Sequence, residues 1–197
     1  MNRKATIIRT TKETDITVEI ALDGAGSAHS NSGVPFLDHM FASFAMHGRF
    51  DLTVECKGDT AVDDHHSTED IGICFGHAID EALGEKLGIN RFGHAFIPMD
   101  ESLVRVIVDL SGRSFIHFDT SMLEGRWTGS FDAGLVKEFF QAVTQTGKMT
   151  VHLDILHGLN PHHIVEAIFK AFGRALKEAV SVVDEKNFIL PSTKGSL

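Results

Sequence analysis

The chain has 197 residues, 43% of them apolar, so it can bury the core of one generous domain or of two small halves packed together. Its 27 acidic and 18 basic residues give a net charge of −9, which argues against binding to nucleic acid. No apolar run reaches the roughly 18 residues of a membrane helix, and the basic N-terminus lacks the apolar stretch of a signal peptide. Two cysteines cannot form a disulfide framework, which fits the cytoplasm. Histidine stands out, with 12 copies.

The predicted elements of the first half are two strands, a helix and a further strand. Alternating apolar and polar residues predict strands over 5–10 and 13–23. A helical apolar stripe predicts a helix over 36–47, ended by Gly48 as a left-handed C′ residue. A strand over 50–56 follows.

The second half repeats this order with one additional strand before its helix. Strands are predicted over 94–98, 102–109 and 114–119, followed by a helix over 136–146 and a strand over 149–155. Each half then closes with a longer helix that has one apolar face.

Each half carries one copy of the pattern His-His-x-x-Glu, predicted to lie in the first turn of its last helix. Asp63-Asp64 offers acidic caps before one copy, and Asn160-Pro161 before the other is typical of an N-cap followed by proline. The copies lie 97 residues apart and are His65-His66 with Glu69 and His162-His163 with Glu166.

The match between the halves extends beyond this motif. Gly76 pairs with Gly173 at the same spacing of 97, and the strand that begins at Glu13 repeats from Glu101 at a spacing of 88. Blocks aligned in the same order indicate an internal duplication. We therefore predict an α+β fold of two duplicated half-domains, each a mixed or antiparallel sheet with helices on one face, related by pseudo-twofold symmetry. The half-domains span residues 1–90 and 91–197 and form one compact unit.

The motif has the geometry of a metal chelate. Residues four apart share one face of a helix, so the first histidine and the glutamate of each copy can bind one ion. The second histidine points about 100° away and can reach a second ion. We therefore predict two metal ions, each shared between the halves. One would be bound by His65, Glu69 and His163, and the other by His162, Glu166 and His66.

Two further ligands are predicted at equivalent positions of the earlier helices. His39 lies in the helix of the first half, and Glu138 occupies the matching position of the second. Imidazole and carboxylate ligands without thiolate favour Mn, Fe, Co or Zn, and several ligands with open positions favour six-coordinate Mn²⁺.

Three other interpretations use the same residue types. A single motif could consist of histidines and acids that only cap a helix, although two copies in register make this a weak reading. A dinuclear metallohydrolase would activate a metal-bound hydroxide against a phosphoester. A structural metal protein would use the ions only to join subunits.

Several ordered segments resemble the imidazoleglycerol-phosphate dehydratase family over essentially the whole chain. They are RTTKET at 9–14, GVPFLDHM at 33–40, HGRFDL at 47–52, GDTAVDDHHSTED at 58–70, PMDE at 98–101, SGR at 111–113, NPHHIVEAIFKAFGRAL at 160–176 and PSTKG at 191–195. The resemblance implies dehydration of D-erythro-imidazole glycerol phosphate to imidazole acetol phosphate in L-histidine biosynthesis. It also implies two Mn²⁺ ions per active site and homo-oligomeric 24-subunit shells built from trimers, with active sites between subunits.

The same resemblance assigns roles to individual residues. It implies that seven of the eight residues named above bind metal. Many members have histidine where this chain has Glu138, which we keep as a predicted ligand because glutamate also binds manganese. Glu13 matches a glutamate proposed as an acid/base that contacts the substrate, and His47 is a second catalytic candidate that we expect near the site. The groups that would hold the substrate phosphate, two of them in the C-terminal tail, are Arg91, Arg113, Lys170, Ser192 and Lys194.

This chemistry fits the residues. The C–H bond beside the second hydroxyl of the substrate is not acidic, so direct elimination would be slow. Two metal ions on the two ring nitrogens can stabilise an imidazolate, which expels the adjacent hydroxide to give a diazafulvene. Loss of the neighbouring proton then yields an enol and finally the ketone, with Glu13 as the predicted proton carrier.

Overall fold

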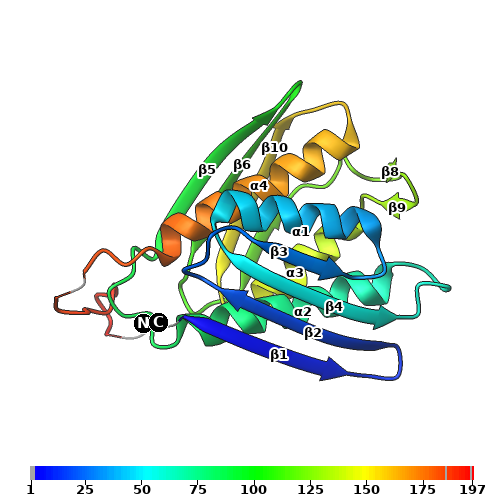
Figure 1. Cartoon of the computed structure of the whole chain (residues 1–197). Coiled ribbons are helices and arrows are strands. Elements are labelled where there is room, and N and C mark those ends of the chain that lie inside the picture. Colours follow the sequence, from blue (N-terminus) through cyan, green and yellow to red (C-terminus); the bar gives the residue numbers. More distant parts are fainter. Residues whose placement is uncertain (1–2, 185, 196) are drawn as a thin grey trace.

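Each half of the chain forms one four-stranded mixed sheet (Figure 1). The computed structural model describes residues 3–184, 186–195 and 197. In the first sheet the strand order is β1-β2-β4-β3, with β1, β2 and β4 antiparallel and β3 parallel to β4. Its strands are β1 (Lys4–Thr10), β2 (Thr14–Ala21), β3 (Ala28–Asn31) and β4 (Asp51–Gly58).

The second sheet has the same topology, which confirms the predicted duplication of the fold. Its strand order is β5-β6-β10-β7, again with three antiparallel strands and a last strand, β7, parallel to its neighbour. Its strands are β5 (Phe92–Met99), β6 (Ser102–Asp109), β7 (Phe115–Phe118) and β10 (Thr150–His157). A separate short hairpin joins β8 (Trp127–Thr128) and β9 (Phe131–Asp132). The sequence patterns did not predict this hairpin or β3, because such short strands show no clear alternation.

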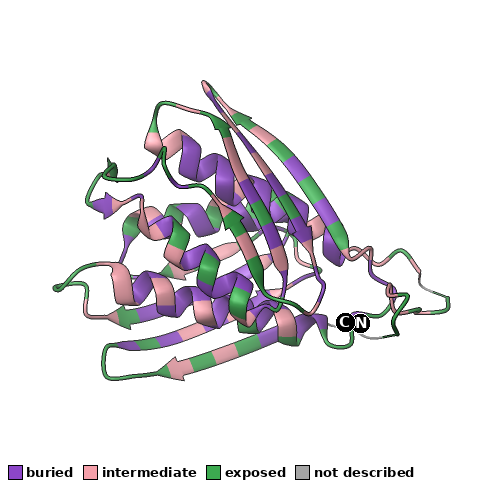
Figure 2. Ribbon diagram, turned by 180° about the vertical axis from the view of Figure 1, so that it is seen from behind, coloured by how far each residue is buried: buried purple, intermediate pink, exposed green. Residues whose placement is uncertain are grey.

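Helices cover one face of each sheet, as predicted, and the described residues form four of them. They are α1 (Pro35–Gly48), α2 (His65–Leu83), α3 (Leu135–Thr146) and α4 (Pro161–Val180). Helix α2 packs on β1 and β2, whereas α4 packs on β5 and β6. The burial pattern alternates along the strands, so the opposite face of each sheet is open (Figure 2). None of the helices in the described ranges is long and apolar enough to cross a membrane.

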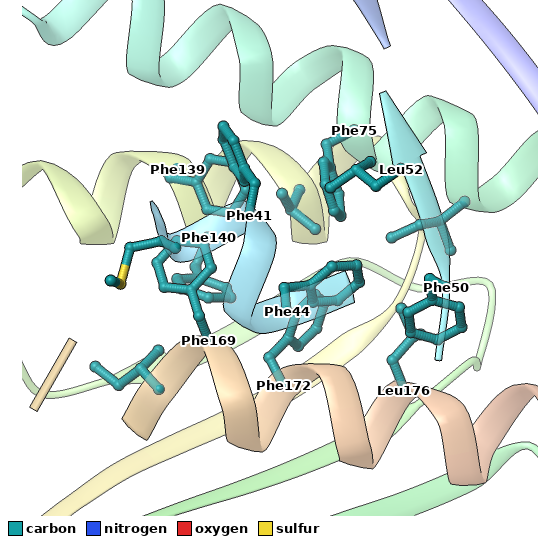
Figure 3. Close-up of a cluster of buried hydrophobic side chains, with 14 of the residues drawn as sticks. Phe41, Phe44, Phe50, Leu52, Phe75, Phe139, Phe140, Phe169, Phe172 and Leu176 are labelled. Atoms are coloured by element: carbon teal, nitrogen blue, oxygen red, sulfur yellow. The ribbon is translucent and has the colours of Figure 1, made fainter. Parts of the chain in front are cut away.

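The halves join through crossed helix pairs. Helix α1 of the first half packs on α4 of the second, and α2 packs on α3. Phenylalanine rings fill the space between the helices (Figure 3). The ring centroid of Phe44 lies 5.6 Å from that of Phe172 across one pair, and that of Phe75 lies 5.7 Å from Phe139 across the other. Nine of the 15 phenylalanines of the chain have fully buried side chains, so the core accounts for most of them.

The repeated glycines lie where the crossed helices approach most closely. A Cβ atom on Gly173 would lie 2.6 Å from the carbonyl oxygen of Phe44, and one on Gly76 would clash with that of Val143. Gly48 faces Gly173 in turn, with a Cβ position 2.9 Å from the Gly173 carbonyl oxygen. Only hydrogen fits at these positions.

The prediction that Gly48 takes a left-handed C′ conformation is wrong. Gly48 is the last residue of α1, and the left-handed residue is Arg49, with φ 53°. The equivalent Lys148, after α3, is also left-handed, with φ 48°. Gly48 therefore serves packing against α4 and the Phe50 ring, since any side chain there would overlap both.

Replacing Gly173 by alanine should destabilise the protein. Alanine favours a helix interior by up to about 1 kcal/mol over glycine, but the Cβ would force α1 and α4 apart, and overpacking of this kind costs about 1–3 kcal/mol. Urea unfolding at fixed protein concentration should show a lower midpoint for G173A. The neighbouring, exposed Arg174 provides the control, because R174A should stay within about 0.5 kcal/mol of the wild type. A G173A midpoint at or above that of the wild type would contradict the close-packing explanation.

Candidate metal and active site

Both histidine motifs lie in the first turn of a helix, as predicted. The side chain of Asn160 accepts a hydrogen bond from the backbone N–H of His162 at 2.9 Å, which caps α4. In the first half the carboxylate of Asp63 accepts from the backbone N–H of His65 at 2.8 Å. The N-cap residue of α2, Asp64, makes no side-chain cap hydrogen bond, so Asp63 alone of the predicted acidic pair binds the helix start.

One compact cluster joins the two halves. His162 Nε2 lies 3.1 Å from Glu166 Oε2, and His39 Nε2 lies 3.4 Å from the same oxygen. The three ligand atoms all lie within 4.8 Å of one another. His39 comes from α1 and the other two residues from α4, so the α1–α4 contact assembles this cluster.

Lys170 fixes the orientation of the carboxylate in this cluster. Its Nζ lies 2.8 Å from Glu166 Oε1, which leaves Oε2 for the two imidazoles. Burial of Glu166 opposes ionisation, but the hydrogen bond and charge of Lys170, with smaller contributions from His39 and His162, outweigh it and lower the pKa of Glu166. A buried, ionised carboxylate oxygen beside two imidazole nitrogens is a donor set that fits a divalent metal ion such as Mn²⁺ or Zn²⁺.

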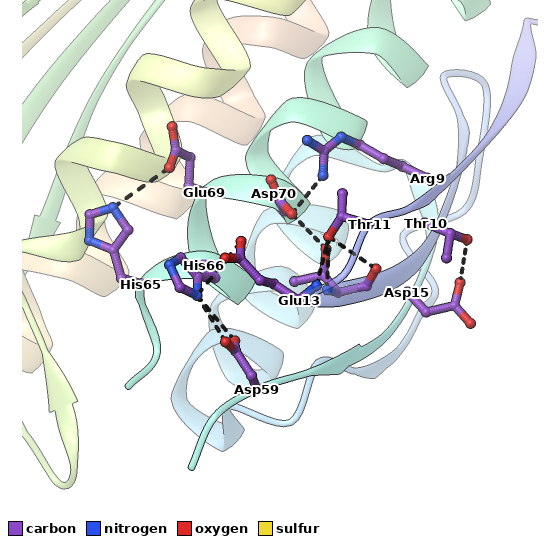
Figure 4. A network of polar contacts seen from close by, with 11 residues as sticks. Arg9, Thr10, Thr11, Glu13, Asp15, Asp59, His65, His66, Glu69 and Asp70 are labelled. Carbon is purple, nitrogen blue, oxygen red and sulfur yellow. Dashed lines mark hydrogen bonds and ion pairs between the residues drawn. The ribbon is translucent and has the colours of Figure 1, made fainter. Parts of the chain in front are cut away.

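The equivalent cluster of the first half is more open (Figure 4). His65 Nε2 lies 3.6 Å from Glu69 Oε2, and both side chains are almost half exposed. Glu138 lies in the first turn of α3, which packs on α2. Across the described ranges it does not complete a cluster as tight as that of His39.

The short β8–β9 hairpin lies beside both clusters. A cavity of about 560 Å³ next to His65 is lined by Trp127 and Asp132 of this hairpin. A second cavity, of about 350 Å³, next to His39, is lined by Thr128 and Phe131. The hairpin thus borders open space at each cluster, which the sequence did not reveal.

The second histidine of each motif contacts a carboxylate that the sequence analysis did not single out. His66 Nδ1 lies 3.0 Å from Asp59 Oδ2, and His163 Nδ1 lies 2.7 Å from Glu101 Oε2. These hydrogen bonds are the main reason that the pKa of each histidine is raised. The alignment of Glu101 with Glu13 was the signal in the sequence that could have found one of the two.

The predicted crossing of ligands between the halves is not found within one chain. In the part of the chain that the structure describes, His39, His162 and Glu166 form the one group of three metal-competent residues with ligand atoms within 4.8 Å. Neither His66 nor His163 joins the cluster of the opposite half in that group.

Glu13 sits on a turn that is anchored to the motif helix. The hydroxyl of Thr11 accepts from the backbone N–H groups of Glu13 and Thr14, at 3.1 and 3.0 Å. The hydroxyl of Thr14 donates to Asp70 at 2.5 Å, and Arg9 lies 2.6 Å from the same carboxylate (Figure 4). Because Asp70 follows Glu69 in α2, this network holds the Glu13 turn beside the first metal motif.

The residues predicted to hold phosphate separate into two places. Arg91 donates to the carbonyl oxygen of Pro191 at 2.8 Å, which ties the tail to the start of β5. Farther along the tail, Lys194 lies just beyond Ser192, whose hydroxyl accepts its backbone N–H at 3.2 Å. The end of the tail reaches the turn that contains Arg113, because Leu197 packs on Gly112.

This group lies at the far end of α4 from its motif. The backbone N–H of Arg91 donates to Ala179, which is about 26 Å along the helix from His162 at 1.5 Å per residue. Lys170, beside Glu166, is the predicted phosphate group that lies near the metal cluster.

His47 lies in the last turn of α1, two turns beyond His39. It lines a cavity of about 500 Å³ together with Arg49, Arg174 and Lys177. Burial, followed by the charges of Lys170 and Arg174, lowers its pKa. Along the axis of α1, His47 lies about 12 Å from His39 of the metal cluster.

These features define a class: α+β proteins of two repeated halves with histidine–carboxylate metal sites at the helix starts. Residues 32–176, which include both motifs, match the sequence profile of the imidazoleglycerol-phosphate dehydratase family. The chain belongs to this family of hydro-lyases of histidine biosynthesis.

Relatives extend the similarity to the whole chain. The imidazoleglycerol-phosphate dehydratase of Desulfotalea psychrophila is 52% identical over 196 residues, covering 100% of this chain and 97% of the relative. That of Geobacillus thermodenitrificans is 52% identical over 197 residues and covers both chains fully.

Two solved structures share the fold. The crystal structure of the Staphylococcus aureus enzyme matches with a TM-score of 0.81 and 42% identity, covering 91% of this chain and 99% of that one. The Pyrococcus furiosus enzyme, crystallised with (S)-C348, matches with a TM-score of 0.82 and 39% identity, covering 97% and 100%.

Proposed function

We propose that this chain dehydrates D-erythro-imidazole glycerol phosphate with two Mn²⁺ ions held by the histidine–carboxylate clusters at the helix starts. The observation that carries the proposal is the convergence of His39 and His162 on one oxygen of Glu166. When bound, the ions would supply positive charge to the ring nitrogens of the substrate, which favours loss of a ring proton. The imidazolate and diazafulvene route stays a prediction.

Glu13 is the proposed proton carrier. Its side chain is about half exposed and lies 3.9 Å from His66 Nδ1, so it borders the first motif without a fixed hydrogen bond to it. The network of Thr11, Thr14 and Asp70 limits the freedom of the turn. A carboxylate held at the edge of the site but free to move its head can protonate the leaving hydroxide or take up the C–H proton.

The active site is proposed to form between subunits. Arg91, which holds the tail at Pro191, contacts α4 at Ala179, about 26 Å along the helix from His162. A substrate of one imidazole ring, three carbons and a phosphate is much shorter than that distance. A neighbouring subunit would therefore bring its tail to the metal cluster, in keeping with a homo-oligomer of 24 subunits built from trimers.

A cytoplasmic location completes the proposal. Cys56 and Cys74 are both buried free thiols, which suits a reducing compartment.

Metal removal gives the direct test of the cofactor. After treatment with a chelator, the protein should lose nearly all formation of imidazole acetol phosphate, and added Mn²⁺ should restore it. The ketone product is measured as its enolate absorbance in alkali, with inorganic phosphate assayed in parallel. Full turnover by the metal-free protein would contradict the metal role, and release of phosphate in place of the ketone would favour a metallohydrolase.

The variant E13Q should retain metal and assembly yet lose nearly all turnover. An amide has the shape of the carboxylate but cannot accept the proton. Mn²⁺ content by elemental analysis and particle mass by light scattering should match the wild type. The matched control is E19Q on the same strand, β2, where Glu19 contacts Lys4 on the surface, and its kcat should be unchanged. Substantial activity in E13Q would eliminate the proposed role.

Mixed assemblies test whether sites are shared between subunits. A chain that lacks residues 191–197 and a chain with E166Q should each have little activity alone. Co-expressed in one assembly, they should regain a fraction of the activity set by random assortment, because some sites then combine an intact tail with an intact metal cluster. The separately purified variants mixed without reassembly are the control. Mixed particles as inactive as their parents would contradict shared sites.

A further inference from the structure

Glu13 and Glu101 occupy equivalent hairpin turns of the two halves but have different surroundings. Glu13, between β1 and β2, aligns with Glu101, between β5 and β6. Both face Nδ1 of the second histidine in the motif of their own half, at 3.9 Å for Glu13 and His66 and at 2.7 Å for Glu101 and His163. Only Glu101 is within hydrogen-bond distance.

The oxygens of Glu101 are divided between two tasks. Oε1 accepts the backbone N–H groups of Leu159 and Asn160, at 3.1 and 2.8 Å, and the hydroxyl of Ser102 at 3.0 Å. Oε2 faces His163 Nδ1. Because these three donors occupy Oε1, Oε2 is the oxygen that accepts from His163, and an ionised carboxylate is an acceptor only.

An acceptor at Nδ1 decides which ring nitrogen carries the proton. Because ionised Glu101 cannot donate, neutral His163 must hold its proton on Nδ1, which leaves the lone pair of Nε2 free. Asp100 Oδ2 lies 3.7 Å from Nε2, too far for a hydrogen bond. Carboxylates often fix metal-binding histidines in this way.

In the first half, Asp59 and not the turn glutamate Glu13 provides the acceptor at Nδ1 of the second histidine. Both carboxylate oxygens of Asp59 lie near His66 Nδ1, at 3.0 and 3.3 Å. Figure 4 shows Asp59 joined to the His66 ring and the Glu13 side chain beside the same ring. With the histidine already oriented by Asp59, the turn glutamate is left free for the proton transfer proposed above.

We propose that Glu101 and Asp59 are positioning residues that hold His163 and His66 with Nδ1 protonated and Nε2 available to a metal ion. This inference rests on the proposed metal function. It explains why only one of two equivalent glutamates is suited to acid/base work, since the other is committed to a backbone cap and a histidine.

The variant E101Q makes an unusual prediction. The two backbone N–H groups require an oxygen, so the glutamine oxygen should stay at the Oε1 position and its NH₂ should face His163. The amide would then donate to Nδ1 and move the proton to Nε2, where it blocks metal binding. The variant E101A removes the acceptor for the Leu159 and Asn160 N–H groups. It leaves His163 able to carry its proton on either ring nitrogen. In D59N the side-chain amide can turn its oxygen to His66, because no backbone N–H in the described ranges donates to the Asp59 carboxylate.

The experiment is calorimetric titration of Mn²⁺ into the metal-free, full-length protein, with thermal unfolding of the same metal-free samples. E101Q should bind Mn²⁺ about 10–100-fold more weakly than the wild type, and more weakly than E101A, although E101A should have the lower Tm. D59N should lose less affinity than E101Q. The matched control is E178Q, because Glu178 likewise accepts a backbone N–H and contacts a histidine, His94, away from the site, and its Mn²⁺ affinity should be unchanged.

Two results would overturn the proposal in distinguishable ways. If the wild type binds Mn²⁺ and E101Q binds it equally well, or if affinity falls only in step with Tm, the positioning role is wrong while the metal function stands. If the wild type binds no Mn²⁺, the proposed metal function fails and the positioning role fails with it.

Discussion

The close approach of helices from opposite halves is the constraint on which the rest of this structure depends. Glycines at the crossing points let α1 lie on α4 and α2 on α3 at backbone contact, and phenylalanine rings fill the space between them. This packing brings His39 of one half to Glu166 of the other. The metal cluster is thus a product of the core, because separating the helices would separate the ligands.

Duplication gave two similar scaffolds whose residues then took different roles. The motif histidines, helix starts and hairpin turns have counterparts in both halves. Yet the cluster around Glu166 is compact with a buried carboxylate, whereas that around Glu69 is open. The turn glutamates differ in the same way. The Glu101 carboxylate accepts backbone N–H groups and contacts His163. The Glu13 carboxylate is about half exposed and lies 3.9 Å from His66. Such divergence suits a reaction that needs both fixed ligands and a group that moves a proton.

A single chain separates the parts that one substrate needs. The clustered His162 and Glu166 lie in the first turns of α4, whereas Arg91 and the tail segment that it holds lie toward its end. A rigid helix cannot shorten this distance. Assembly of several copies is the physical solution that such a layout invites, and it would couple metal binding to subunit association.

Local patterns were sufficient to predict most of the architecture. Alternation predicted β6 at its observed bounds, and the apolar stripe predicted α3 within one residue, because a face that must be buried imposes its period on the sequence. The capping residues before each histidine motif likewise predicted its place in the first turn, because a cap is local to its helix. The two-residue strands of the β8–β9 hairpin were missed because they are too short to show a period.

The sequence by itself therefore determined the repeated halves, the motif helices, the family and the residue types of the site. Tertiary structure alone decided which of these residues meet. It paired His39 with α4, gave Asp59 and Glu101 to the second histidines, and placed Arg91 and the tail far from the cluster while Lys170 lies beside it. The physical reason is that a helix or strand period reports which face of an element is buried, but not which distant element covers that face.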